Sequence, residues 1–266
     1  MGEPRVLVDV DDAGVATVTL NRGDKHNALD AAMFEGIVAA ASTVAEDRSV
    51  RAVVLHGAGK SFCSGLDIGS LGAGGGAETL LARTDDNPAN HAQRVSTDWA
   101  QVPAPVIAAI TGNCFGGGLQ IALGADIRYA TPDSRQSIME VKWGLVPDMG
   151  ISQTLPRLVS ADVAKELTFT GRIISGAEAH ALGLVTAVSE DPLAHAIAVA
   201  HEIATKSPLA VRAAKRLYDE TWTGCDAHSA LLLESELQVG LMGSPNQMEA
   251  VAAGMQRRPA RFADPD

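Results

Sequence analysis

Three consecutive glycines, Gly116 to Gly118, lie between an apolar run at residues 105–110 and a second apolar segment at 119–124. The first run is typical of a buried strand and the second of a short helix. Backbone N–H groups at the start of such a helix can approach a ligand closely, and the helix dipole favours a negatively charged oxygen there. A tight strand-to-helix turn explains the same triplet equally well.

A second glycine segment, residues 62–67 with Gly65, follows another strand-like run at 51–56. On neighbouring strands of one sheet, the two glycine segments could each donate an N–H group to the same oxygen. That pairing is what an oxyanion hole requires.

Two acids, Glu140 and Asp148, stand in an otherwise largely apolar stretch at residues 139–150. A buried carboxyl group has a raised pKa and can act as a general acid or base near neutral pH. The alternative is structural: Glu140 as an ion-pair partner and Asp148 as a helix N-cap after Pro147. The residues by themselves favour this second interpretation.

Other familiar motifs are incomplete. Gly59-Lys60-Ser61 resembles the end of a phosphate-binding loop, but the position of its first glycine is Val54. Residues 150–154 lack the final glycine of an esterase nucleophile elbow. The seven histidines are scattered without a metal-binding spacing, so we expect no metal site.

The composition narrows the function further. The 266 residues carry 32 acids against 21 bases, a net charge of −11, which disfavours a nucleic-acid binder. Three cysteines at unrelated spacings suggest neither a disulfide framework nor a zinc site. We find no signal peptide and no apolar run long enough for a membrane span, and we expect a cytoplasmic location.

Alternating strands and helices must position these groups. We predict strands at residues 15–20, 51–56, 105–110 and 126–130, and helices at 28–44 and 119–124. Five helical segments follow, at 161–170, 177–182, 192–206, 209–222 and 229–241. This order predicts an α/β core with a helical C-terminal subdomain. The glycine-rich stretch at 69–90 has no strong periodicity, and we interpret it as a mobile loop.

Five segments resemble, in order, motifs of the crotonase (enoyl-CoA hydratase/isomerase) superfamily. They are Asn21-Arg22 with Asn27-Ala28-Leu29, then residues 62–67, 110–118, 125–128 and 140–150. The resemblance extends over about residues 5–262. It implies a crotonase-like spiral core of ββα turns at residues 1–200 and a helical subdomain at 201–266 that mediates trimers, or hexamers built from two trimers.

The resemblance also implies a site for an acyl-CoA thioester. The backbone N–H groups of Leu66 and Gly117 would form the oxyanion hole and stabilise an enolate. Lys25, His26 and Arg22 would face the CoA phosphates, and the loop at 69–90 would shape the acyl pocket. Coenzyme A arrives as part of the substrate, and no other cofactor is implied. The implied substrate-binding residues are Lys25, His26, Ala28, Leu29, Ser64, Gly65, Asp67, Ile68, Phe115, Gly116 and Pro147.

The reaction depends on the acids. Family hydratases use two glutamates, and one of those positions is Gln120 here, an amide that cannot take a proton. The other is Glu140, and Asp148 falls where similar dienoyl-CoA isomerases carry an aspartate. We therefore expect double-bond isomerisation with Glu140 and Asp148 as the proton-transfer groups and Gln120 as an orienting partner. The alternatives are an enoyl-CoA hydratase using Glu140 alone and an inactive acyl-CoA-binding protein.

Overall fold

The computed structural model describes residues 3–71, 80–83 and 87–265. Much of the segment predicted to be a mobile loop, residues 72–79 and 84–86, lies outside the described residues. The described part of that segment is not entirely irregular, because it includes the end of a short helix, α2 (Ile68–Leu71). None of the described helices has the length and apolar character to cross a membrane.

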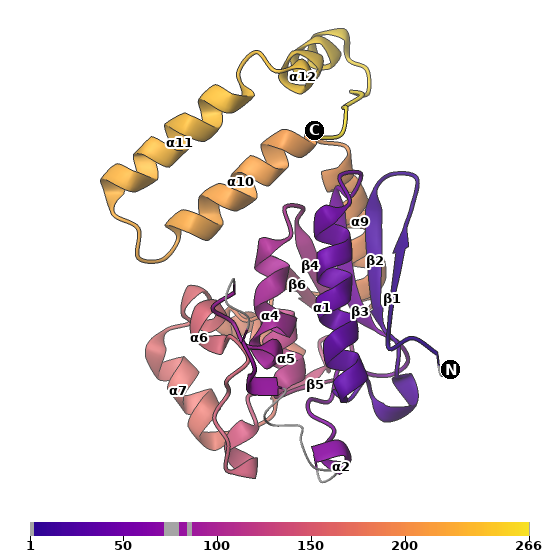
Figure 1. Cartoon of the computed structure of the whole chain (residues 1–266), viewed down its shortest axis with the longest axis vertical. Helices are drawn as coiled ribbons and strands as arrows, with labels where there is room; N and C mark the ends of the chain where they lie inside the picture. The colour runs from indigo at the N-terminus through magenta and orange to yellow at the C-terminus, as the bar shows by residue number, and fades with distance from the viewer. Residues whose placement is uncertain (1–2, 72–79, 84–86, 266) are drawn as a thin grey trace.

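A six-stranded sheet forms the centre of the core (Figure 1). Its first strand is antiparallel to the second, and the other neighbouring pairs are parallel. The apolar runs of β3 and β4 have buried residues on both faces, as expected for a parallel sheet covered on both sides. In sheet order the strands are β1 (Val6–Val10), β2 (Val15–Leu20), β3 (Ala52–Gly57), β4 (Val106–Ile110), β6 (Ile127–Ala130) and β9 (Ala187–Val188).

Helices cover the two faces of this sheet. Alternate residues of β3 point to opposite sides, so that Val53 and Leu55 join one apolar cluster and Ala52 and Val54 the other. The first cluster includes residues of α1 (Ala31–Glu46), α4 (His91–Gln101) and α5 (Gly117–Leu123). The second apolar cluster includes three buried alanines of α9 (Pro192–Ala204), namely Ala196, Ala200 and Ala204.

A smaller sheet lies beside the glycine triplet. It consists of β5 (Asn113–Phe115), β7 (Arg135–Ser137) and β8 (Ile174–Ser175). Because β5 ends at Phe115, it carries the chain directly into α5. The helices that follow β7 are η2 (Glu140–Trp143), α6 (Ile151–Thr154), η3 (Leu155–Arg157), α7 (Ala161–Thr170) and α8 (Gly176–Leu182).

The predicted strands and helices are confirmed, with ends that shift by up to three residues. The largest shift is at the start of α1, which begins at Ala31 because the Asp30 side chain accepts a hydrogen bond from Met33 N, 2.9 Å away, and caps the helix. Among the elements that the sequence did not predict are α4, α12 (Pro245–Gln256) and the strands β1, β5, β7, β8 and β9.

The C-terminal helices form an arm that extends away from the sheet (Figure 1). They are α10 (Pro208–Thr221), α11 (Ala227–Leu241) and α12 (Pro245–Gln256). The predicted boundary at residue 200 falls inside α9, which packs on the sheet, whereas α10 is the first helix of the arm. The division of the chain into two domains stays a prediction.

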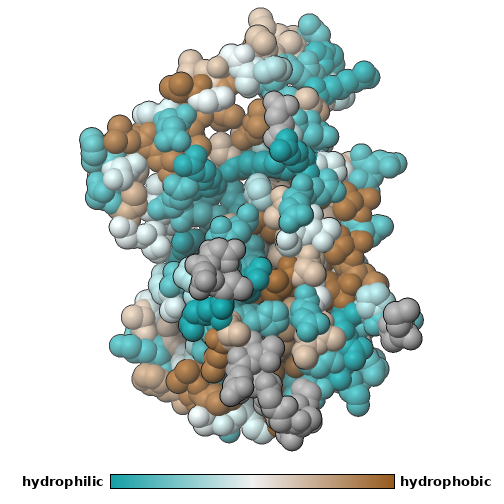
Figure 2. All heavy atoms as spheres, viewed as in Figure 1, coloured by the Kyte–Doolittle hydropathy of each residue, from teal (hydrophilic) through white to brown (hydrophobic). Residues whose placement is uncertain are grey.

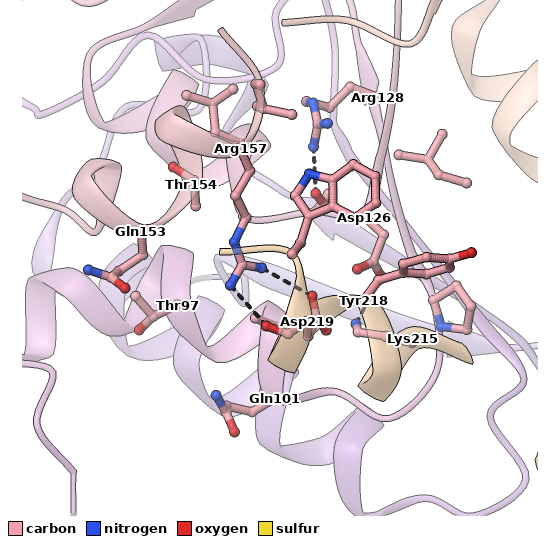
Figure 3. Close-up of a pocket in the computed structure, with 18 of the residues that line it drawn as sticks. Thr97, Gln101, Asp126, Arg128, Gln153, Thr154, Arg157, Lys215, Tyr218 and Asp219 are labelled. Atoms are coloured by element: carbon pink, nitrogen blue, oxygen red, sulfur yellow. Dashed lines mark hydrogen bonds and ion pairs between the residues drawn. The ribbon is translucent and has the colours of Figure 1, made fainter. Parts of the chain in front are cut away.

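Lys215 of α10 anchors the arm to the core. Its ammonium group donates hydrogen bonds to the carbonyl oxygens of Trp99 and Ala104, both at 3.2 Å, and to Asp126 Oδ2 at 2.9 Å. The side chain is only 7% exposed. These contacts line a pocket of about 720 Å³ between arm and core (Figure 3), and no residue predicted for the acyl-CoA site lines it.

We expect Lys215→Met to destabilise the protein by about 1–3 kcal/mol, because methionine keeps the packing but leaves Ala104 O without its donor and the Asp126 carboxylate without its cation. Urea unfolding measures the change. Lys206→Met is the matched control, since Lys206 is exposed and its pairing with Glu202 at 3.6 Å contributes less than about 0.5 kcal/mol. Equal unfolding midpoints for the two variants would show that Lys215 does not hold the arm.

Candidate active site

The two glycine segments lie side by side, as the sequence predicts. The backbones of Cys63 and Cys114 pair as an isolated parallel β-bridge, and Cys63 N donates to Asn113 O at 3.1 Å. A Cβ atom on Gly65 would lie 2.7 Å from Phe115 O and 3.7 Å from Gly117 N. Only glycine allows the two backbones to come this close.

The N–H group of Leu66 points toward this junction. The residues before and after Leu66 both bond to Leu29. Leu29 N donates to Gly65 O at 2.8 Å, and Asp67 N donates to Leu29 O at 3.0 Å. In a parallel pairing of this kind, the residue between the two bonds directs its own N–H to the opposite side. Within the described part of the chain, that N–H group has no hydrogen-bond acceptor.

Gly117 supplies a second available donor. It is the first residue of α5, and the first bond of that helix runs from Gln120 N to Gly116 O at 3.0 Å. The N–H group of Gly117 therefore has no acceptor in its own helix, and none among the other described residues. A Cβ atom there would lie 2.7 Å from Met149 Sδ and 3.0 Å from Leu29 Cδ1, so a larger residue would have to displace these two side chains.

A chain of hydrogen bonds holds the predicted acid Glu140 beside these donors. Met149 N donates to Gln120 Oε1 at 2.8 Å, which leaves Gln120 Nε2 to donate to Glu140 Oε1 at 2.6 Å. Gln120 is 1% exposed, so its amide has little freedom to turn. Glu140 Oε1 lies 3.3 Å from the position that a Cβ of Gly116 would take.

The free oxygen of Glu140 is suited to proton transfer. Oε2 is buried and has no hydrogen-bond partner among the described residues. Burial raises the pKa of Glu140, and the nearby charge of Asp148 raises it further, while the hydrogen bond from Gln120 lowers it. A carboxyl group with a raised pKa exchanges protons more readily near neutral pH.

Asp148 is exposed, whereas the sequence suggested two buried acids. The apolar residues around it explain the difference, because Leu145 and Val146 are themselves exposed and do not cover the carboxyl. Asp148 nevertheless lies close enough for its charge to act on Glu140.

The segments predicted to bind CoA are joined to each other. Ser64 N donates to His26 O at 2.9 Å, and His26 Nδ1 lies 2.9 Å from Ser61 Oγ. Asn27 belongs to one of the family-like motifs, but nothing in the sequence indicates its structural role. Its fully buried amide donates to three carbonyl oxygens and fixes this turn. Its backbone has a φ of 54°, a conformation that favours asparagine over most residues. The carbonyl acceptors are those of Ala58, Ser61 and Phe62.

Arg22 lies within the turn and bonds to its neighbours there, and its predicted role toward the CoA phosphates stays a prediction. It donates to Asp67 Oδ2 at 2.8 Å and to Ala28 O at 3.0 Å, and it lies 3.5 Å from Asp30 Oδ2. Its side chain is 13% exposed. Asp67 thus helps to hold the turn. The remaining charged candidate, Lys25, is exposed.

The other predicted substrate-binding positions differ in exposure. Leu29, Gly65 and Gly116 are buried, and Leu29 packs against Gly117. Ile68 is exposed. Those that are half-buried are Ala28, Ser64, Phe115 and Pro147.

Two backbone donors beside a buried carboxyl suit an enzyme that stabilises an oxyanion while moving a proton. Comparison with known proteins agrees. The pattern of the enoyl-CoA hydratase/isomerase family matches residues 11–265, so the chain belongs to this family, whose members bind acyl-CoA substrates. The fold is the crotonase fold predicted from the sequence.

The relatives include both hydratases and isomerases. The chain is 35% identical to the peroxisomal Delta(3,5)-Delta(2,4)-dienoyl-CoA isomerase of Arabidopsis thaliana, over 95% of this chain and 94% of that protein. It is 34% identical to the mitochondrial enoyl-CoA hydratase domain-containing protein 2 of Bos taurus, over 94% and 84%. The crystal structure of enoyl-CoA hydratase from Bacillus anthracis superimposes with a TM-score of 0.87 at 31% identity, covering 97% of this chain and 98% of that one.

The raised pKa of Glu140 predicts a pH-dependent effect of Glu140→Gln on stability. Between the unfolded and folded pKa values, the folded protein keeps a proton that the unfolded chain has lost, so the free energy of unfolding falls as pH rises. Glutamine removes this titration and still accepts the hydrogen bond from Gln120. We expect the variant to be more stable than the wild type at neutral pH, with the gain disappearing toward about pH 4.

Denaturant unfolding at several pH values measures this difference. Asp133→Asn serves as the control, because it makes the same exchange of a carboxyl for an amide at an exposed position. A Glu140→Gln variant that becomes less stable relative to the wild type as pH rises would contradict the assignment.

Proposed function

We propose that this protein moves a double bond in an enoyl- or dienoyl-CoA thioester. The observation that supports this is the Gln120–Glu140 contact at 2.6 Å, which pairs the acid with an amide and not with a second carboxylate. An amide can orient its partner but cannot take part in proton transfer. This favours a reaction in which Glu140 and Asp148 exchange protons with carbon atoms.

In the proposed mechanism, the thioester oxygen accepts hydrogen bonds from the N–H groups of Leu66 and Gly117. Glu140 Oε2 removes a proton from a carbon atom conjugated with the thioester, and the electron pair of that C–H bond moves onto the thioester oxygen as a dienolate or trienolate. Asp148, which is exposed, passes a proton from solvent to a carbon atom further along the chain, where the electron pair of the enolate forms the new C–H bond and the double bond shifts. Glu140 releases its proton to solvent before the next turnover. Removal of one oxyanion donor typically costs about 3–4 kcal/mol of transition-state stabilisation.

Hydration is the alternative reaction, with Glu140 alone activating water. The similarity to a hydratase and to hydratase-domain proteins supports it, and the similarity to a dienoyl-CoA isomerase supports isomerisation. An inactive acyl-CoA-binding protein is a third candidate, but such a protein would have no need to keep a buried acid of raised pKa beside the donors.

Turnover of 2-enoyl, 3-enoyl and 3,5-dienoyl CoA thioesters by the purified protein distinguishes these candidates. We expect isomerisation of a 3-enoyl or 3,5-dienoyl substrate, and a loss of roughly 100-fold or more in Glu140→Gln, the range of general acid–base catalysis. Asp148→Asn should also lose activity, while the exposed control Asp133→Asn should keep it. Rapid hydration of a 2-enoyl-CoA that survives Asp148→Asn but not Gln120→Ala would contradict isomerisation.

We also propose that the arm mediates a trimer or a hexamer. Hydrophobic side chains are exposed on all three helices of the arm, where brown atoms gather in Figure 2. An exposed apolar surface of this kind marks an interaction site. These residues are Tyr218, Trp222, Leu231, Leu232, Val239, Met242, Met248, Val251 and Met255.

Light scattering on the intact protein tests the assembly, with a mass of three or six chains expected. A monomeric mass at micromolar concentration would contradict it. The cytoplasmic location stays a prediction, and the proposed reaction requires no cofactor beyond the CoA of the substrate.

A further inference from the structure

The side chain of Met149 fills the space beside the oxyanion donor Gly117. Its Sδ and Cε atoms lie 2.7 Å and 3.1 Å from the position that a Cβ of Gly117 would occupy, and Leu29 Cδ1 lies 3.0 Å from the same point. Met149 is 7% exposed and Leu29 is fully buried. The two side chains thus form an apolar wall around Gly117.

The backbone of Met149 is fixed as well. Its N–H group donates to Gln120 Oε1 at 2.8 Å, and the same amide donates to Glu140 Oε1. One residue therefore contacts the oxyanion donor with its side chain and supports the acid through its backbone. A methionine side chain is normally adaptable, but here the wall and the fixed backbone leave it little space to move.

We infer that Met149 determines specificity by excluding substituents on the carbon atom next to the thioester carbonyl. This inference rests on the proposed function, because it requires the thioester oxygen to bind at Gly117 N. The carbon atom next to that carbonyl must then lie between Gly117 and Glu140, against the thioether. A hydrogen atom fits there, whereas a methyl branch overlaps the Met149 side chain. The substrates are therefore acyl chains that are unbranched at this carbon.

Binding of two saturated thioesters, butanoyl-CoA and 2-methylbutanoyl-CoA, tests the inference without any turnover. They differ by one methyl group on the carbon in question. Calorimetry on the wild type should show weaker binding of the branched thioester, roughly 10- to 200-fold, the usual range for one methyl group in a fitted pocket. In Met149→Ala the ratio should fall below about threefold, because the space is open.

Met33→Ala is the matched control. Met33 is another buried methionine, but its atoms are not among those nearest to Gly117, so its removal should loosen the core and leave the ratio unchanged. If Met149→Ala does not fold, Met149→Cys keeps a buried sulfur on a shorter side chain and should give an intermediate ratio.

Equal binding of the two thioesters by the wild type overturns the inference and leaves the proposed function in place. If the ratio of the two affinities is unchanged in the Met149 variants, the inference is likewise overturned and the proposed function stays in place. If butanoyl-CoA does not bind the wild type at all, the proposed function fails, and the inference fails with it.

Discussion

The active site depends on how closely the backbone of residues 63–66 approaches that of residues 113–118. Side chains on Gly65 or Gly118 would overlap the carbonyl oxygens of Phe115 and Cys63, so neither position can carry a Cβ without moving the other segment. The approach also brings the backbone of Gly65, next to Leu66, close to Gly117 N, because a Cβ atom on Gly65 would lie 3.7 Å from that nitrogen. The N–H groups of Leu66 and Gly117 are donors without acceptors among the described residues, and their positions come from the backbone alone.

The pairing of Glu140 with an amide sets the chemistry of the acid. Two carboxyl groups at 2.6 Å would share a proton and titrate as one coupled pair. Gln120 cannot titrate, so in the proposed reaction Glu140 would exchange a proton through Oε2 by itself. The Met149 N–H group fixes the orientation of the Gln120 amide, so that Gln120 Nε2 faces Glu140. Glu140 Oε1 is therefore an acceptor only. The same contact supports the proposed isomerisation over a hydration that uses two acids.

Local sequence patterns were sufficient to predict the strands and the glycine segments. The apolar runs at β3 and β4 and the glycines that follow them are signals within a few residues, and they indicated that two backbone segments could each direct a donor to one oxygen. The resemblance to a family then gave Leu66 and Gly117 as the expected donors. It also singled out Glu140 and Gln120 among many polar residues. Strands as short as β5 carry too few residues for such a pattern.

Properties that depend on distant contacts were not predictable in this way. Arg22 is bound by Asp67, 45 positions along the chain, and no local pattern indicates this ion pair. Asp148 is exposed because its apolar neighbours do not fold over it. In the sequence, Met149 is only the residue after Asp148. Its contact with Gly117 is found only in the three-dimensional structure.

The central claim is that the N–H groups of Leu66 and Gly117 bind a thioester oxygen. The infrared stretching frequency of an isotopically labelled thioester carbonyl in a bound saturated acyl-CoA tests it most directly. Two donors on one oxygen weaken the C=O bond, so the frequency should fall below its value for the same thioester in water. A frequency equal to or above the value in water would show that the oxygen binds elsewhere and would contradict the account.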